Sequence, residues 1–94
     1  MDVNALSYSA HAVDKVAAHG LTMAEVEQTA RNGAVVVANP HPRIEGSRLM
    51  IGPTDGGRIV TVVIDPTLDP TTWEVRTAWP ATDTQAAHYR RHRR

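Results

Sequence analysis

Three strand-like segments in the second half of the chain most constrain its fold. They cover residues 47–52, 58–65 and 73–79, and each carries apolar, β-branched or aromatic residues typical of strands. The turn Pro53-Thr54-Asp55-Gly56-Gly57 between the first two has the Asp-Gly chemistry of a β-hairpin. A further β-branched run at residues 34–38 supplies another strand. The sequence therefore predicts a four-stranded antiparallel sheet.

Capping signals open the expected helices. Ser9 is placed to cap the first helix, while Thr22 with Glu25 and Thr82 with Gln85 form capping boxes for two others. The helices are expected at residues 10–19, 23–32 and 83–92. The first two make a helical hairpin, so the whole order is helical hairpin, four strands and C-terminal helix. Segregated helices and strands predict an α+β fold.

The length of the chain indicates a single domain over residues 1–94. It contains no cysteine, which excludes disulfides and thiolate chemistry. The N-terminus lacks the basic start and apolar run of a signal peptide, and no apolar stretch reaches membrane-spanning length. We therefore expect a cytoplasmic protein without a membrane partner.

Charge is unevenly distributed although the formal net charge is zero. Residues 89–94 hold four of the ten basic side chains, so the rest of the chain is acidic. This asymmetry makes Arg90 and Arg91, in the tail 90–94, candidates for RNA binding. A tail that only keeps the protein soluble is the alternative.

Arginine recurs in the expected sheet, at Arg48, Arg58 and Arg76. Strict alternation would put Trp73, Val75, Thr77 and Trp79 on the core face of the last strand and turn Arg76 outward. Arginines on adjacent strands would then form a concave phosphate site, since guanidinium groups bind phosphate in a bidentate manner. The alternative is three separate surface arginines, paired with Glu45, Asp55 and Glu74.

His11 and Lys15 stand four residues apart and therefore share one face of the first helix. Histidine suits acid and base roles in RNA cleavage, and lysine suits charge stabilisation. Thr77 and Tyr89 are candidates to orient phosphate or stack a base, and Trp79 can stack on a nucleobase from a strand end. The structural alternatives are that His11 caps its own helix or packs on Tyr8 and that Trp79 belongs to the core. Lys15 could instead be a solvated partner of Asp14 or Glu25.

The other histidines carry weaker signals. His19 is expected to cap the end of its helix, and His41, between two prolines, is expected to be inert. His88 and His92 are four residues apart on the last helix, but no third ligand accompanies them. We expect neither a metal nor another cofactor.

Several short motifs resemble those of the BrnT family of bacterial toxins, a branch of the RelE-like ribonuclease superfamily, and of related small domains that open with a His-Ala helix. The likeness covers roughly residues 8–90 and lies in the order and spacing of its pieces. These are His11-Ala12 with Lys15, His19-Gly20-Leu21-Thr22 with Glu25-Val26, Arg48–Gly52, Gly57–Val63, and Thr77–Thr82 leading to Tyr89.

This resemblance implies a toxin of a type II toxin–antitoxin system that cuts RNA without metal, either free or on the ribosome, and is silenced by a cognate antitoxin. His11 would act as base or acid, and Arg48, Arg58 and Arg76 would clamp phosphate. Lys15 and Tyr89 would assist. BrnT-like proteins usually carry an arginine where this chain has Trp79. A non-catalytic partner-binding or nucleic-acid-binding module of the same fold is therefore the alternative.

Overall fold

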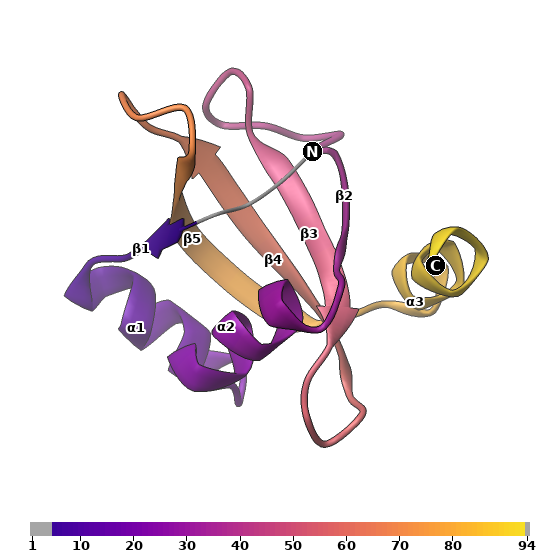
Figure 1. Cartoon of the computed structure of the whole chain (residues 1–94). Coiled ribbons are helices and arrows are strands. Elements are labelled where there is room, and N and C mark those ends of the chain that lie inside the picture. The colour runs from indigo at the N-terminus through magenta and orange to yellow at the C-terminus, as the bar shows by residue number, and fades with distance from the viewer. Residues whose placement is uncertain (1–4, 94) are drawn as a thin grey trace.

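The computed structural model describes residues 5–93 and has an α+β architecture (Figure 1). The tail residue Arg94 and the segment Met1–Asn4, which entered the sequence analysis, lie outside the described residues. Among residues 5–93, none of the helices has the length and apolarity needed to cross a membrane. In chain order the elements are β1 (Ala5–Ser7), α1 (Ala10–Ala18), α2 (Met23–Arg31), β2 (Val35–Ala38), β3 (Arg48–Pro53), β4 (Ile59–Pro66), β5 (Thr72–Pro80) and α3 (Asp83–His92).

The strands form one five-stranded mixed sheet in the order β1-β5-β4-β3-β2. The four expected strands are present and pair in antiparallel fashion, each within a residue or two of its expected bounds. The sequence analysis missed β1, which adds to the edge of β5 in parallel. Because β1 has only three residues, it shows no period of its own, and its pairing with β5 is set by distant residues.

Helices α1 and α2 cover one face of the sheet, which we call the helix face (Figure 1). α1 packs on β5, and α2 packs on β3 and β4. Val16 and Val26 from these helices join Met50, Val62 and Val75 of the sheet in the main core, all at most 1% exposed. Burial of this apolar surface is the main force that holds the helices to the sheet.

The opposite face, the open face, is only partly covered by α3, which stands at its far edge in Figure 1. Tyr89 of α3 packs there against Leu49, Ile51 and Val63, and Trp79 packs on the same cluster. The two faces thus have separate apolar clusters. On the open face a cavity remains beside α3.

A register shift interrupts the pairing of β4 with β5 between Val63 and Ile64. Val63 lies opposite Thr77, whereas Ile64 lies opposite Val75, so Arg76 is an extra residue, as in a β-bulge. The expectation that Trp73, Val75, Thr77 and Trp79 share one face was therefore wrong. Trp73 and Val75 belong to the helix face, while Thr77 and Trp79 belong to the open face.

The predicted helix caps are confirmed. The Ser9 side chain accepts from the Ala12 N–H, and both capping boxes form reciprocally, Thr22 with Glu25 and Thr82 with Gln85. Local hydrogen bonds of this kind need no distant partner, so the sequence fixes them.

Gly52 allows α2 and the start of β2 to pack closely on β3. A Cβ atom at this position would lie 2.9 Å from the Ala34 Cβ and 3.1 Å from the Thr29 carbonyl oxygen. Both neighbours belong to a packed backbone and cannot simply rotate away. The contact between helix and sheet therefore requires glycine here.

We expect Gly52→Ala to lower the free energy of unfolding by roughly 1–3 kcal/mol, because the added methyl group overpacks this contact. Urea unfolding followed by circular dichroism measures the change. Gly56→Ala is the matched control, since the added Cβ would lie an ordinary 3.8 Å from the Thr54 hydroxyl. Equal stability of Gly52→Ala and the wild type would contradict this account of the packing.

Candidate functional site

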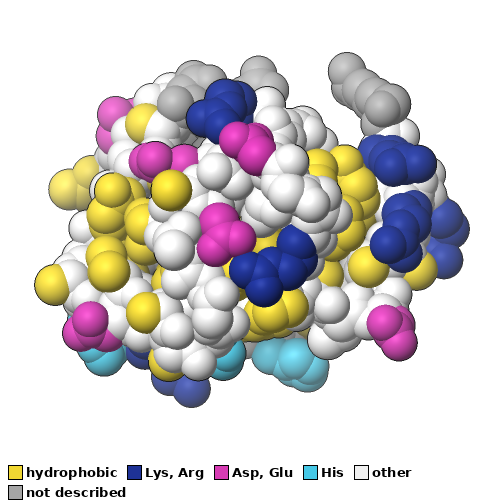
Figure 2. Space-filling model, turned by 90° about the horizontal axis from the view of Figure 1, so that it is seen from below, with side chains coloured by type: hydrophobic (Ala, Val, Ile, Leu, Met, Phe, Trp, Pro, Cys, Tyr) yellow, Lys and Arg dark blue, Asp and Glu magenta, His cyan; other side chains and the backbone are white. Residues whose placement is uncertain are grey.

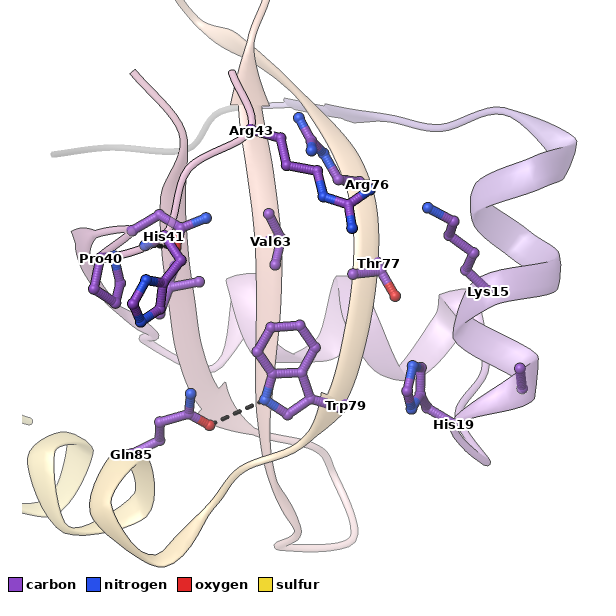
Figure 3. Close-up of a pocket in the computed structure, with 13 residues that line it drawn as sticks. Lys15, His19, Pro40, His41, Arg43, Val63, Arg76, Thr77, Trp79 and Gln85 are labelled. Carbon is purple, nitrogen blue, oxygen red and sulfur yellow. Dashed lines mark hydrogen bonds between the residues drawn. The ribbon is translucent and has the colours of Figure 1, made fainter. Parts of the chain in front are cut away.

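A cavity of about 450 Å³ opens on the open face (Figure 3). Its floor is formed by β3, β4 and β5, and its walls come from α1, from α3 and from the loop that joins β2 to β3 (residues 39–47). The chain segments that meet here are far apart in the sequence. Figure 3 shows positively charged groups toward one end of the cavity and aromatic rings toward the other.

Three cationic side chains from three different elements line the charged end: Lys15 of α1, Arg43 of the loop and Arg76 of β5. Figure 3 shows Arg43 beside Arg76, with Lys15 across from them. Gathering three positive charges raises the local potential and attracts anions. Arginine and lysine are also the side chains best suited to hold phosphate oxygens. This end of the cavity therefore has the composition of a phosphate site.

Arg76 is held in place by Asp65. The Arg76 Nε and Nη2 atoms both lie 2.8 Å from the same Asp65 oxygen, Oδ2. The Asp65 side chain is only 6% exposed and that of Arg76 is 18% exposed. The second oxygen, Oδ1, is buried and has no hydrogen-bond partner among residues 5–93. The pair fixes the direction of the Arg76 guanidinium and leaves its other N–H donors for a ligand.

A second, shallower cavity of about 350 Å³ continues past Lys15, Arg43 and Arg76, which line both cavities. His11 lines this second cavity, and His19 lines the first. His11, Lys15 and His19 follow one another at four-residue intervals along α1, which puts them on one side of the helix. The lysine thus lies between two histidines, one turn from each.

His41, Trp79 and Gln85 lie toward the aromatic end of the first cavity (Figure 3). The Trp79 Nε1–H donates to Gln85 Oε1 at 3.1 Å, which ties the strand end to α3. One side of the indole packs on the open-face cluster, and the residue also lines the cavity. An aromatic ring held in this way can stack on a flat ligand.

The structure does not bring Arg48 and Arg58 to this site, so the predicted cluster of three strand arginines was wrong. Arg48 donates to the carbonyl oxygens of Gly46 and Ser47. Arg58 pairs with Glu25 and donates to the Gly20 carbonyl oxygen on the helix side of the sheet. Arg76 points to the open face, opposite to Val75, whereas Arg58 reaches the turn between α1 and α2. The predicted partners Glu45, Asp55 and Glu74 were wrong as well.

The other predicted residues divide between cavity, core and surface. Thr77 lines the cavity with Trp79. Tyr89 is 6% exposed within the open-face cluster, so its ring serves packing. Arg90 and Arg91 are exposed on α3, and Figure 2 shows Lys and Arg side chains gathered over that helix. They form a basic surface outside the cavity.

Sequence reasoning missed Arg43, His41 and Gln85 as cavity residues. Arg43 and His41 lie in a proline-rich loop that carries no periodic pattern, so nothing local showed where the loop would fold. Gln85 was assigned to its capping box, which it does form. For Arg43 and His41, the one signal in the sequence was the number of polar residues in the loop between the two strands. Binding residues often lie in such loops.

Within the described part of the chain, no three His, Asp or Glu side chains gather in a way that could hold a metal ion. His88 and His92 stack on each other with ring centroids 4.1 Å apart. The His92 Nδ1 atom lies 2.9 Å from the His88 carbonyl oxygen, so this pair is engaged in local contacts of α3.

Residues 8–80 match the family described as Domain of unknown function (DUF4258). The chain belongs to this family. Neither a curated protein nor a solved structure matches it. The matched residues run from the segment before α1 to the end of β5, so they contain the three cations and Trp79. They stop before α3, which supplies Gln85 to the cavity.

The ion pair of Glu25 with Arg58 predicts a pH-dependent part of the stability. The Arg58 guanidinium, by its hydrogen bond, lowers the pKa of Glu25 from its ordinary value of 4.5. A pKa lowered by folding contributes stability above the unfolded value, and this stability is lost as the pH falls through the folded pKa. Because the Arg58 side chain is 46% exposed, solvent screens the pair and the contribution is small.

We expect Glu25→Gln to lower the free energy of unfolding by roughly 0.5 kcal/mol at neutral pH, since glutamine keeps the capping box but loses the ion pair. The difference from the wild type should shrink as the pH falls below 4.5 and through the lowered pKa of Glu25, as measured by urea unfolding at neutral and at acidic pH. Glu27→Gln, at an exposed position of the same helix, is the control. An equal loss at both pH values would contradict the assignment to the ion pair.

Proposed function

We propose that this protein is the toxin of a type II toxin–antitoxin system, an endoribonuclease that cuts RNA with side chains alone and thereby inhibits translation. The observation that carries the proposal is the convergence of Lys15, Arg43 and Arg76 in one cavity, with His11 and His19 on either side of the lysine. The resemblance of several short sequence motifs to those of BrnT-like toxins supports the same function. RNA and a cognate antitoxin are the partners it requires.

Metal-free RNA cleavage transfers the phosphate from the 5′-oxygen of the next nucleotide to the neighbouring 2′-oxygen. A base removes the proton from the 2′-hydroxyl, an acid protonates the leaving 5′-oxygen, and cations stabilise the charge on the phosphate. In the proposed site His11 and His19 take the proton-transfer roles. Lys15, Arg43 and Arg76 hold the phosphate between them.

The geometry of α1 supports this division of roles. His19 follows His11 by eight positions, which corresponds to a rise of about 12 Å along a helix. A phosphate bound near Lys15 would lie between the two histidines, so that one ring could reach the 2′-hydroxyl and the other the leaving 5′-oxygen. The ion pair with Asp65 fixes the orientation of Arg76 in the folded protein. RNA binding therefore loses less conformational entropy in ordering this side chain.

A non-catalytic module that binds RNA or a protein partner is the second candidate. Trp79 favours it, because BrnT-like toxins usually carry an arginine after the Thr-Ala or Ser-Ala of the last strand. In this chain that position lines the cavity with an indole instead of a charge. Such a site would retain phosphate binding and lose part of the stabilisation of the transition state.

The decisive experiment incubates the purified protein with a labelled RNA oligonucleotide in EDTA. We expect cleavage that leaves a 2′,3′-cyclic phosphate and that stops when the 2′-hydroxyl is replaced by hydrogen. His11→Ala should lower the rate by roughly 10²- to 10⁴-fold and Lys15→Ala by roughly 10²-fold. Arg31→Ala is the matched control, because Arg31 pairs with Asp55 on the surface and does not line either cavity.

Intact RNA after incubation with folded protein, with binding that Lys15→Ala weakens, would favour the non-catalytic module. Absence of both cleavage and binding, in free RNA and on ribosomes, would overturn the proposal. Growth arrest on induction in a bacterial host, relieved by His11→Ala at equal protein level, provides the cellular readout of the same chemistry.

A further inference from the structure

The orientation of the Gln85 side-chain amide is fixed by its neighbours. Its Oε1 atom lies 2.9 Å from the Thr61 hydroxyl, 3.1 Å from Trp79 Nε1 and 3.0 Å from the Thr82 backbone nitrogen. An indole N–H and a backbone N–H can only donate. The atom that faces them must therefore be the oxygen, and the opposite flip of the amide would place N–H groups against N–H groups.

This arrangement turns the Gln85 Nε2 group away from Trp79. Figure 3 shows Nε2 directed toward the side of the cavity where His41 lies, while Oε1 faces the indole. All hydrogen bonds of the Gln85 side chain within residues 5–93 use Oε1, so both hydrogens of Nε2 remain for a ligand. A fixed donor thus stands beside an aromatic ring.

We infer that Trp79 and Gln85 form a nucleobase subsite that selects bases with a carbonyl group, uracil or guanine, over cytosine or adenine. This inference rests on the proposed function, since the base would belong to the RNA whose phosphate is bound at Lys15, Arg43 and Arg76. The base stacks on the Trp79 indole, as unpaired bases do on aromatic side chains. The Nε2 group then donates to uracil O4 or guanine O6.

The selectivity follows from hydrogen-bond polarity. Cytosine and adenine present an amino group where uracil and guanine present the carbonyl oxygen. Two donors facing each other leave both unsatisfied in a partly closed cavity, which weakens binding by roughly tenfold. Because three donors hold Oε1, Gln85 cannot rotate its amide to accept from an amino group without losing those bonds. The discrimination is thus built into the fold at the start of α3.

The test uses two dinucleotides that differ only in the hydrogen-bonding edge of their bases, at position 4 and the adjacent N3. They are 2′-O-methyl UpU and 2′-O-methyl CpC, in which the 2′-O-methyl group blocks cleavage. Titration of the full chain is followed by the quenching of tryptophan fluorescence. We expect the wild type to bind UpU roughly tenfold more tightly than CpC. Equal binding of the two dinucleotides would overturn base selection without the need of any variant.

Gln85→Glu is the variant that reverses the polarity of the group facing the base. Glutamate still accepts from Thr61, Trp79 and Thr82 and still completes the capping box, so the fold should persist. The added negative charge weakens the binding of both dinucleotides. The ratio of their two affinities is therefore the quantity to compare with the wild type. We expect the ratio to shift from UpU toward CpC by roughly tenfold or more.

An unchanged preference for UpU in a folded Gln85→Glu variant would overturn the role of Gln85. The Lys15→Ala variant distinguishes a failure of base selection from a failure of the proposed RNA binding. If Lys15→Ala weakens the binding of UpU and CpC equally while the wild type prefers neither, the phosphate site is supported and base selection is rejected. Binding of neither dinucleotide by the wild type overturns both.

Discussion

The extra residue in β5 at Arg76 determines how the two faces of the sheet are used. If β5 alternated regularly, Trp73, Val75, Thr77 and Trp79 would all face α1 and α2, and the open face would lose its indole. With the register shift between Val63 and Ile64, Val75 still faces the main core and Arg76 the open face. The residues that follow change sides, so Ala78 enters the core while Thr77 and Trp79 join Arg76 on the open face. A bulge bends and twists its strand, and here it gives one strand both a core and a cavity.

Arg76, the extra residue of the bulge, places a positive charge in a partly buried position, and the Asp65 carboxylate pairs with it. A buried guanidinium is costly unless it is paired and hydrogen-bonded. Asp65 lies on the neighbouring strand opposite Glu74, next to the register shift, so the partner of Arg76 comes from the adjacent part of the sheet. The pair holds Arg76 in place, whereas the exposed Arg43 and the half-buried Lys15 form no ion pair within residues 5–93. The Arg76 guanidinium therefore stands at the centre of the site with a fixed orientation.

Elements that join the cavity from outside the sheet complete its two ends. α1 presents Lys15 and His19 past the edge of β5, and the loop of residues 39–47 brings Arg43 and His41 over β3 and β4. α3 begins at a capping box whose glutamine also bonds to Thr61 of the sheet. One side chain thereby caps a helix, docks it on the sheet and lines the cavity. The family match ends before this helix, so the aromatic end combines a shared strand with a segment outside the match.

The sequence by itself determined what depends on neighbours within a few residues. The helix caps at Ser9, Thr22 and Thr82, the antiparallel strands β2 to β5 and the α+β class could all be predicted, because capping boxes and period-two patterns are local. His11, Lys15, Thr77 and Trp79 could also be proposed for a site, from residue type and spacing. Only the tertiary structure decided that β1 joins β5, that Arg76 is a bulge residue, and that Arg43 and His41 meet it while Arg48 and Arg58 do not. These outcomes depend on pairing between residues distant in the chain, which no local pattern encodes.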